Sequence, residues 1–155
     1  MPPTEVTIRA AGEQDRDAIR SFAERLSEFQ LPPWRTASEI ADADFGAMME
    51  AVRGRRADNE VWLAERAGEP VGCLHVLSST DFFGRSHAHV SVLATSRAAE
   101  GTGVARALMA HAESWARDRG FALLTLNVFD RNERARRFYD RSGFRAETIK
   151  YAKQL

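Results

Sequence analysis

The segment Val92–Leu108 constrains this chain more than any other part of the sequence. It passes from an apolar, strand-like run into a turn that contains Gly101 and Gly103, and then directly into an amphipathic helix. Glycines adopt backbone conformations that a Cβ disfavours and allow a ligand to approach the main chain closely. The first N–H groups of a helix lack partners within it and carry the positive end of its dipole. The sequence therefore predicts a phosphate or pyrophosphate site at this turn.

Two common phosphate-binding motifs do not fit this turn. A P-loop needs a lysine and a hydroxyl residue directly after its second glycine, and neither follows Gly103. A dinucleotide-binding fingerprint needs a third glycine at the position where Arg106 stands. The phosphate carrier must therefore be inferred from a wider pattern.

Length and composition favour one domain spanning residues 1–155, because 155 residues with 44% hydrophobic composition are enough for a core. The 22 basic and 22 acidic residues balance, so we expect no bulk electrostatic binding to nucleic acid or to an anionic membrane. The single cysteine, Cys73, is typical of a reducing cytoplasm. The chain has no apolar run of membrane-spanning length, and Met1–Thr4 does not look like the start of a signal peptide, so a cytoplasmic protein is expected.

Strand and helix patterns alternate along the chain. A helix with Ser38 as its N-cap is expected to follow a break at Leu31–Trp34, and a hairpin turn is expected around Gly68. The predicted strands are Val6–Arg9, Glu60–Arg66, Pro70–Ser78, His87–Thr95, Leu123–Val128 and a closing strand around Thr148–Lys153. The predicted helices are Glu13–Phe29, Ser38–Val52, a helix from Val104 to Gly120, and Asn132–Ser142, with Asn132 as the N-cap of the last.

Two motifs together resemble the GNAT superfamily of N-acetyltransferases. The first is Glu100-Gly101-Thr102-Gly103-Val104-Ala105, at the place of the family pattern Gln/Arg-x-x-Gly-x-Gly/Ala, from which Glu100 departs. The second runs from Asn132 through Ala135 and Tyr139 to Gly143-Phe144. The resemblance implies an α/β fold with a mixed, twisted sheet flanked by helices on both faces. It also implies acetyl-CoA as co-substrate and direct transfer of its acetyl group to a primary amine.

The resemblance also implies which residues bind acetyl-CoA. The pantetheine arm is expected to bond to strand backbone as a partial extra strand, through Leu93 and Thr95 with Ala94 between them. The pyrophosphate is expected on the glycine turn, and the last helix is expected to contribute further contacts. The full predicted set is Leu93, Ala94, Thr95, Glu100, Gly101, Thr102, Gly103, Val104, Ala105, Asn132 and Ala135.

Two residues are predicted to catalyse the transfer. Tyr139 matches the family tyrosine that protonates the leaving thiolate, and a phenol with its ordinary pKa of ~10 keeps its proton at neutral pH. Packing beside Phe138 is the alternative role of Tyr139. His89 is predicted to be the general base, because histidine titrates near neutral pH. A water chain ending at Glu65 or another carboxylate is the alternative base. Strict alternation would place His89 on the same face of its strand as Ser91, Leu93 and Thr95.

Four aromatic residues are predicted to line an acceptor wall, with ordinary packing as the alternative: Phe29, Trp34, Phe82 and Phe83. Cys73 is expected to be a buried structural thiol, and His75 and His111 are expected to be structural. The four histidines lack metal-ligand spacing. A non-catalytic acyl-CoA-binding regulatory module is the alternative function, and the resemblance implies a possible homodimer in which the tail pairs across a two-fold axis.

Overall fold

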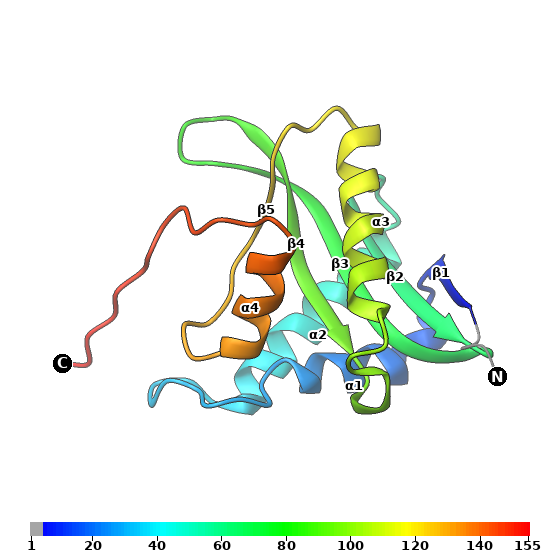
Figure 1. The fold of residues 1–155 in the computed structure, drawn as a ribbon, viewed down its shortest axis with the longest axis horizontal. Coiled ribbons are helices and arrows are strands. Elements are labelled where there is room, and N and C mark those ends of the chain that lie inside the picture. The colour runs from blue at the N-terminus through cyan, green and yellow to red at the C-terminus, as the bar shows by residue number, and fades with distance from the viewer. Residues whose placement is uncertain (1–4) are drawn as a thin grey trace.

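The computed structural model describes residues 5–155, in which five strands form one sheet in the order β1-β2-β3-β4-β5 (Figure 1). Neighbouring strands from β1 to β4 pair antiparallel, whereas β5 runs parallel to β4. The strands are β1 (Val6–Ala10), β2 (Asn59–Arg66), β3 (Glu69–Thr80), β4 (Ser86–Thr95) and β5 (Leu124–Leu126). The predicted mixed sheet of an α/β fold is confirmed. Met1–Thr4, on which the signal-peptide expectation rests, lies outside the described residues.

Helices cover both faces of the sheet (Figure 1). The α-helices are α1 (Arg16–Arg25), α2 (Ala37–Gly54), α3 (Val104–Asp118) and α4 (Glu133–Arg141), and short 3-10 turns cover Glu13–Asp15 and Arg97–Ala99. One core packs α1 and α2 against the sheet and includes Ile19, Met48, Leu63 and Cys73. The other packs α3 against the opposite face and includes Leu74, Val76, Leu108 and Trp115, with Phe138 and Tyr139 of α4 at its edge.

The start of α2 differs from the prediction. The N-cap is Thr36, whose hydroxyl accepts from the Glu39 N–H at 3.2 Å, while the Glu39 carboxylate accepts from the Thr36 N–H at 3.2 Å. This reciprocal arrangement satisfies two N–H groups that have no helical partner. Ser38 therefore lies inside the helix, and the prediction that it is the N-cap was wrong.

Two further boundaries differ. Helix α1 ends at Arg25, and Phe29 packs outside it against Phe129, with ring centroids 5.4 Å apart. The predicted closing strand at Thr148–Lys153 is not formed: among the described residues no strand follows α4, and this segment pairs with none of the five strands. Residues 145–155 instead run away from the sheet as an exposed, extended tail (Figure 1).

A β-bulge in β4 changes which way its side chains point. His75 of β3 pairs with Val92 and Val76 pairs with Val90, so Ser91 is an extra residue in β4. Val90 therefore packs in the α3 core, whereas Val92 packs in the core of α1 and α2. The expected alternation was wrong: His89 points to the α1 and α2 face, and Leu93 points to the α3 face.

Gly72 brings α3 close to the sheet, and we expect its replacement by alanine to destabilise the fold. A Cβ on Gly72 would lie 2.7 Å from Val104 Cγ1 and 2.8 Å from Leu108 Cδ1. Such overpacking costs about 1–3 kcal/mol, which should appear as a lower urea midpoint for Gly72→Ala.

Gly46→Ala is the matched control, since a Cβ at this helix position meets nothing within 4 Å. It should raise the free energy of unfolding by about 0.5–1 kcal/mol. A Gly72→Ala midpoint equal to that of the wild type would show that α3 is not held this tightly.

Candidate active site

Strand β4 loses its partner on one edge halfway along its length. Strand β5 pairs with β4 only at Ala88, His89 and Val90, and among the described residues no strand pairs with that edge from Ser91 to Thr95. The Ser96 N–H donates to the Val71 carbonyl on the β3 side at 2.9 Å. Because backbone groups alternate in direction along a strand, those of Leu93 and Thr95 point to the open edge. An extended ligand can bond to them as a further strand does.

The glycine turn follows directly after this open edge. Gly101 has φ +72° and Gly103 has φ +90°, and a Cβ on either would meet nothing within 4 Å. The Thr102 hydroxyl donates to the Ala99 carbonyl at 2.5 Å, which fixes the turn. Buried Val104 then starts α3, and no side chain caps this helix at Gly103. The first amides of α3, including that of Ala105, therefore remain available to an anion, and the turn fits a pyrophosphate.

Helix α4 begins on the far side of the open edge. The Asn132 side-chain amide oxygen accepts from the Ala135 N–H at 3.3 Å and so caps this helix. The expectation that Asn132 is an N-cap is confirmed. Capping also fixes the first turn of α4, which carries Ala135.

Tyr139 lies on the α3 and α4 face of the sheet. Its ring packs against Phe138 and Phe144, with centroids 5.6 and 5.8 Å away. Burial raises the pKa of the Tyr139 phenol to about 12. The phenol therefore keeps its proton at neutral pH and is able to donate it.

His89 lies on the opposite face, next to β5. Its Nδ1 is 2.7 Å from the hydroxyl oxygen of Thr125. Burial, and to a smaller extent the nearby His87, lower the pKa of His89 below its ordinary value of 6.5. The imidazole is therefore neutral at pH 7 and can accept a proton, and Thr125 fixes the direction of its ring.

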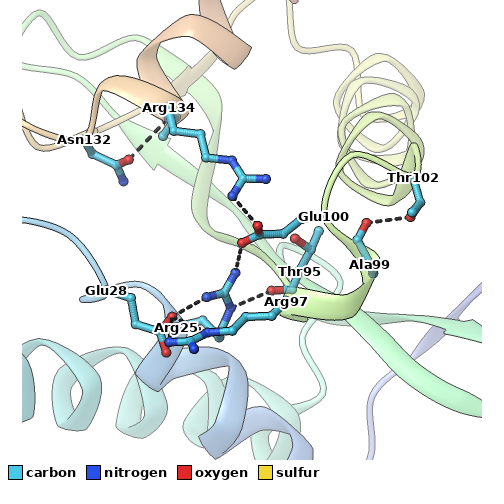
Figure 2. A network of polar contacts seen from close by, with 10 residues as sticks. Arg25, Glu28, Thr95, Arg97, Ala99, Glu100, Thr102, Asn132 and Arg134 are labelled. Carbon is cyan, nitrogen blue, oxygen red and sulfur yellow. Dashed lines mark hydrogen bonds and ion pairs between the residues drawn. The ribbon is translucent and has the colours of Figure 1, made fainter.

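Glu100 is part of a polar network beside the glycine turn (Figure 2). Its carboxylate pairs with both Arg25 of α1 and Arg134 of α4. Arg25 also donates from Nε to the Thr95 carbonyl at 2.9 Å. Arg134 and then Arg25 lower the pKa of Glu100, so the carboxylate is charged at neutral pH.

These features lie within one matched region. The model of the acetyltransferase (GNAT) family matches residues 19–144, which include the open edge, the glycine turn and α4. The chain belongs to this family. Members of the GNAT family use acetyl-CoA for acyl transfer.

Solved structures of other proteins have the same fold. A putative acetyl transferase from Pyrococcus furiosus is 22% identical, covers 97% of this chain and 100% of its own, and superposes with a TM-score of 0.75. An aminoglycoside N-acetyltransferase in complex with CoA is 15% identical, covers 100% of this chain and 99% of its own, and has a TM-score of 0.73. A transcriptional regulator from Bacillus halodurans C-125 is 25% identical, covers 97% and 100%, and has a TM-score of 0.71. No curated protein matches this chain.

The four predicted acceptor residues do not form one wall. Phe82 and Phe83 pack against each other at the β3–β4 turn and are 97% and 83% exposed. Phe29 and Trp34 lie in the segment between α1 and α2, at the other end of the sheet (Figure 1). Of the four, Phe29 reaches the side of the open edge, where it packs against Phe129 after β5.

Four other residues considered in the sequence contact side chains away from the open edge: Glu65, Cys73, His75 and His111. Glu65 lies on β2, with β3 between it and β4, and pairs with Arg9, so it does not lie beside the open edge. Burial raises the pKa of the Cys73 thiol to about 12, and its Sγ donates to Met48 Sδ at 3.7 Å. His75 bonds to Asn59, and His111 packs edge-on against Trp62.

Two kinds of feature are absent from residues 5–155. No group of three or more His, Cys, Asp or Glu side chains there is arranged to hold a metal ion. In the same residues, no helix is both long enough and apolar enough to cross a bilayer.

Three residues of the site were not predicted from the sequence: Thr125, Arg25 and Arg134. Thr125 stands in a predicted strand, but its contact with His89 depends on the β4–β5 register. Arg25 and Arg134 contact Glu100 from helices far apart in the chain. The acidic residue at a position where the family has Gln or Arg was the one available signal, since a carboxylate beside a phosphate site requires nearby cations.

Proposed function

We propose that this GNAT protein transfers the acetyl group of acetyl-CoA directly to a primary amine within a ternary complex. The observation that carries the proposal is the open β4 edge leading directly into the glycine turn. The edge offers strand bonds to a pantetheine arm, and the turn offers helix amides to a pyrophosphate. Asn132 and Ala135, at the start of α4, are proposed to contact the same ligand.

The two catalytic residues act from opposite faces of the sheet. His89, on the α1 and α2 face, takes a proton from the incoming amine. The amine nitrogen then forms a bond to the thioester carbonyl carbon, whose oxygen is polarised by a backbone N–H near Leu93. As the carbon–sulfur bond breaks, Tyr139 donates its proton to the leaving thiolate from the α3 and α4 face. The acceptor therefore enters from the α1 and α2 face, where Phe29 and Trp34 stand, and Phe82 and Phe83 are proposed to contact only a larger acceptor.

A second candidate function is acyl-CoA binding without turnover. It is favoured by one comparison, since the 25% identical structure from Bacillus halodurans is described as a transcriptional regulator. Against it stand the protonated phenol of Tyr139 and the neutral imidazole of His89. We also propose that the enzyme works in the cytoplasm, because its one cysteine, Cys73, is free.

The first test combines calorimetric titration of CoA with acetyl-CoA-dependent thiol release over a panel of amines. We expect CoA binding, and turnover with one class of amine. Gly103→Arg should abolish binding, because its side chain would fill the turn that the pyrophosphate needs.

Gly84→Arg is the matched control, since Gly84 also has positive φ and open surroundings but lies in the β3–β4 turn. It should bind CoA as the wild type does. Binding without turnover on any amine would favour the regulatory module, and no binding would contradict both candidates.

Tyr139→Phe should lower kcat about 10²-fold and leave CoA affinity nearly unchanged, because it removes only the proton donor. Steady-state kinetics and calorimetry measure the two effects. Tyr151→Phe removes the hydroxyl of the only other tyrosine, which lies on the exposed tail, and should change neither. Full activity of Tyr139→Phe would show that another group is the acid.

His89→Gln should lower kcat/KM about 10²-fold and remove the acid limb of its pH profile. The sign follows from the pKa: the base is active when neutral, and a lowered pKa puts the half-maximum below pH 6.5. His87→Gln is the control, since His87 lies on the same face with its ring centroid 6.4 Å from that of His89. If the acid limb disappears in His87→Gln and persists in His89→Gln, then His87 is the base.

We further propose a homodimer in which the tail of one copy pairs with the free edge of β5 in the other. The tail exposes Ile149 and Tyr151, and within residues 5–155 β5 has a strand partner on one side only. Light scattering should give the mass of a dimer, and deletion of residues 147–155 should give a monomer. A dimer that survives the deletion would show that copies associate elsewhere.

A further inference from the structure

An acidic side chain stands at the place where this protein is proposed to bind pyrophosphate. Glu100 directly precedes Gly101, and its side chain points into the space between α1 and α4 (Figure 2). A bare carboxylate there would repel a phosphate. The Glu100 carboxylate is not bare, because the Arg25 and Arg134 guanidinium groups both contact it.

The same cluster has more cations than anions. Arg97 donates to the Glu28 carboxylate at 2.9 Å, and Arg25 pairs with that carboxylate as well. The five charged residues of the cluster are Arg25, Arg97, Arg134, Glu28 and Glu100, three basic and two acidic. The surroundings of the turn are therefore net positive even though Glu100 is charged.

Glu100 contacts α1 and α4 directly, through Arg25 and Arg134, and is linked to β4 through Arg25. Arg25 is the last residue of α1, and its Nε also bonds to the Thr95 carbonyl on the open edge of β4. Arg134 lies in the first turn of α4, beside Asn132. Its side chain is 64% exposed and reaches across to the turn that precedes α3. Among residues 5–155, Glu100 provides the contact that holds the Arg134 side chain beside the turn.

We propose that Glu100 is a positioning residue for the CoA pyrophosphate, acting through Arg25 and Arg134. It holds both guanidinium groups beside the glycine turn, where they offer charge-assisted hydrogen bonds to phosphate oxygens. The inference rests on the proposed binding of acetyl-CoA. In this role the Glu100 carboxylate strengthens the binding of CoA, although its own negative charge would repel the pyrophosphate.

The direction in which one substitution changes CoA affinity distinguishes repulsion by Glu100 from positioning by Glu100. Glu100→Gln removes a negative charge beside the pyrophosphate, so simple repulsion predicts tighter CoA binding. Positioning predicts weaker binding: calorimetric titration with CoA should show a Kd about three- to tenfold higher than that of the wild type. The KM for acetyl-CoA should rise by a similar factor, with kcat unchanged.

Further variants separate positioning from folding. Glu100→Asp keeps the charge but is too short to reach both arginines, so it should also raise the Kd. The effect of Glu100→Gln should shrink in an Arg134→Gln background, because the two residues act together. Asp58→Asn is the matched control, since Asp58 pairs with Arg56 between α2 and β2 and should leave the Kd unchanged. Urea unfolding of each variant checks that the fold is intact.

The outcomes distinguish this inference from the function on which it rests. Failure of the wild type to bind CoA would overturn the proposed function and the inference together. Binding by the wild type, with Glu100→Gln or Glu100→Asp binding equally well or more tightly, would overturn the inference alone. Higher Kd values for both variants, with that of Asp58→Asn unchanged, would support it.

Discussion

The early separation of β5 from β4 is the constraint on which the rest of the structure depends. After Val90, no strand among the described residues pairs with one edge of β4, although unpaired backbone groups are costly when they are shielded from water. The Arg25 side chain satisfies the last of them, the Thr95 carbonyl. The others are not paired with a strand of the described residues, and this polar edge is what a strand-like ligand arm can use.

The bulge at Ser91 gives this edge two different faces. Before the bulge, His89 points toward the α1 and α2 side, and after it Leu93 points toward α3. The proposed base and acid, His89 and Tyr139, consequently lie on opposite faces of the sheet with the open edge between them. Such a separation suits a reaction in which the nucleophile arrives from one face and the leaving group is protonated from the other.

Burial shifts the pKa values of Tyr139 and His89 in opposite directions, and both shifts suit the proposed roles of these residues. Removing a group from water disfavours its charged form, which raises the pKa of a phenol and lowers the pKa of an imidazole. The Tyr139 phenol therefore keeps its proton, and the His89 imidazole stays neutral. At the glycine turn the charges are instead balanced by pairing, since Arg25 and Arg134 surround Glu100.

The mixed sheet was predicted from the resemblance to the GNAT family. Local patterns in the chain were enough to predict most helix and strand positions, the glycine turn with its helix, and Asn132 as an N-cap. They were enough because turn chemistry, caps and apolar periodicity depend on residues that are neighbours in sequence. The bulge at Ser91, the bond from His89 to Thr125, the pairing of Glu100 with two distant arginines and the unpaired tail depend on register and on packing between remote segments. A shift of one residue reverses the face of every side chain that follows, and no local pattern records that shift. The chain alone therefore specified which groups are available, and folding specified which of them meet.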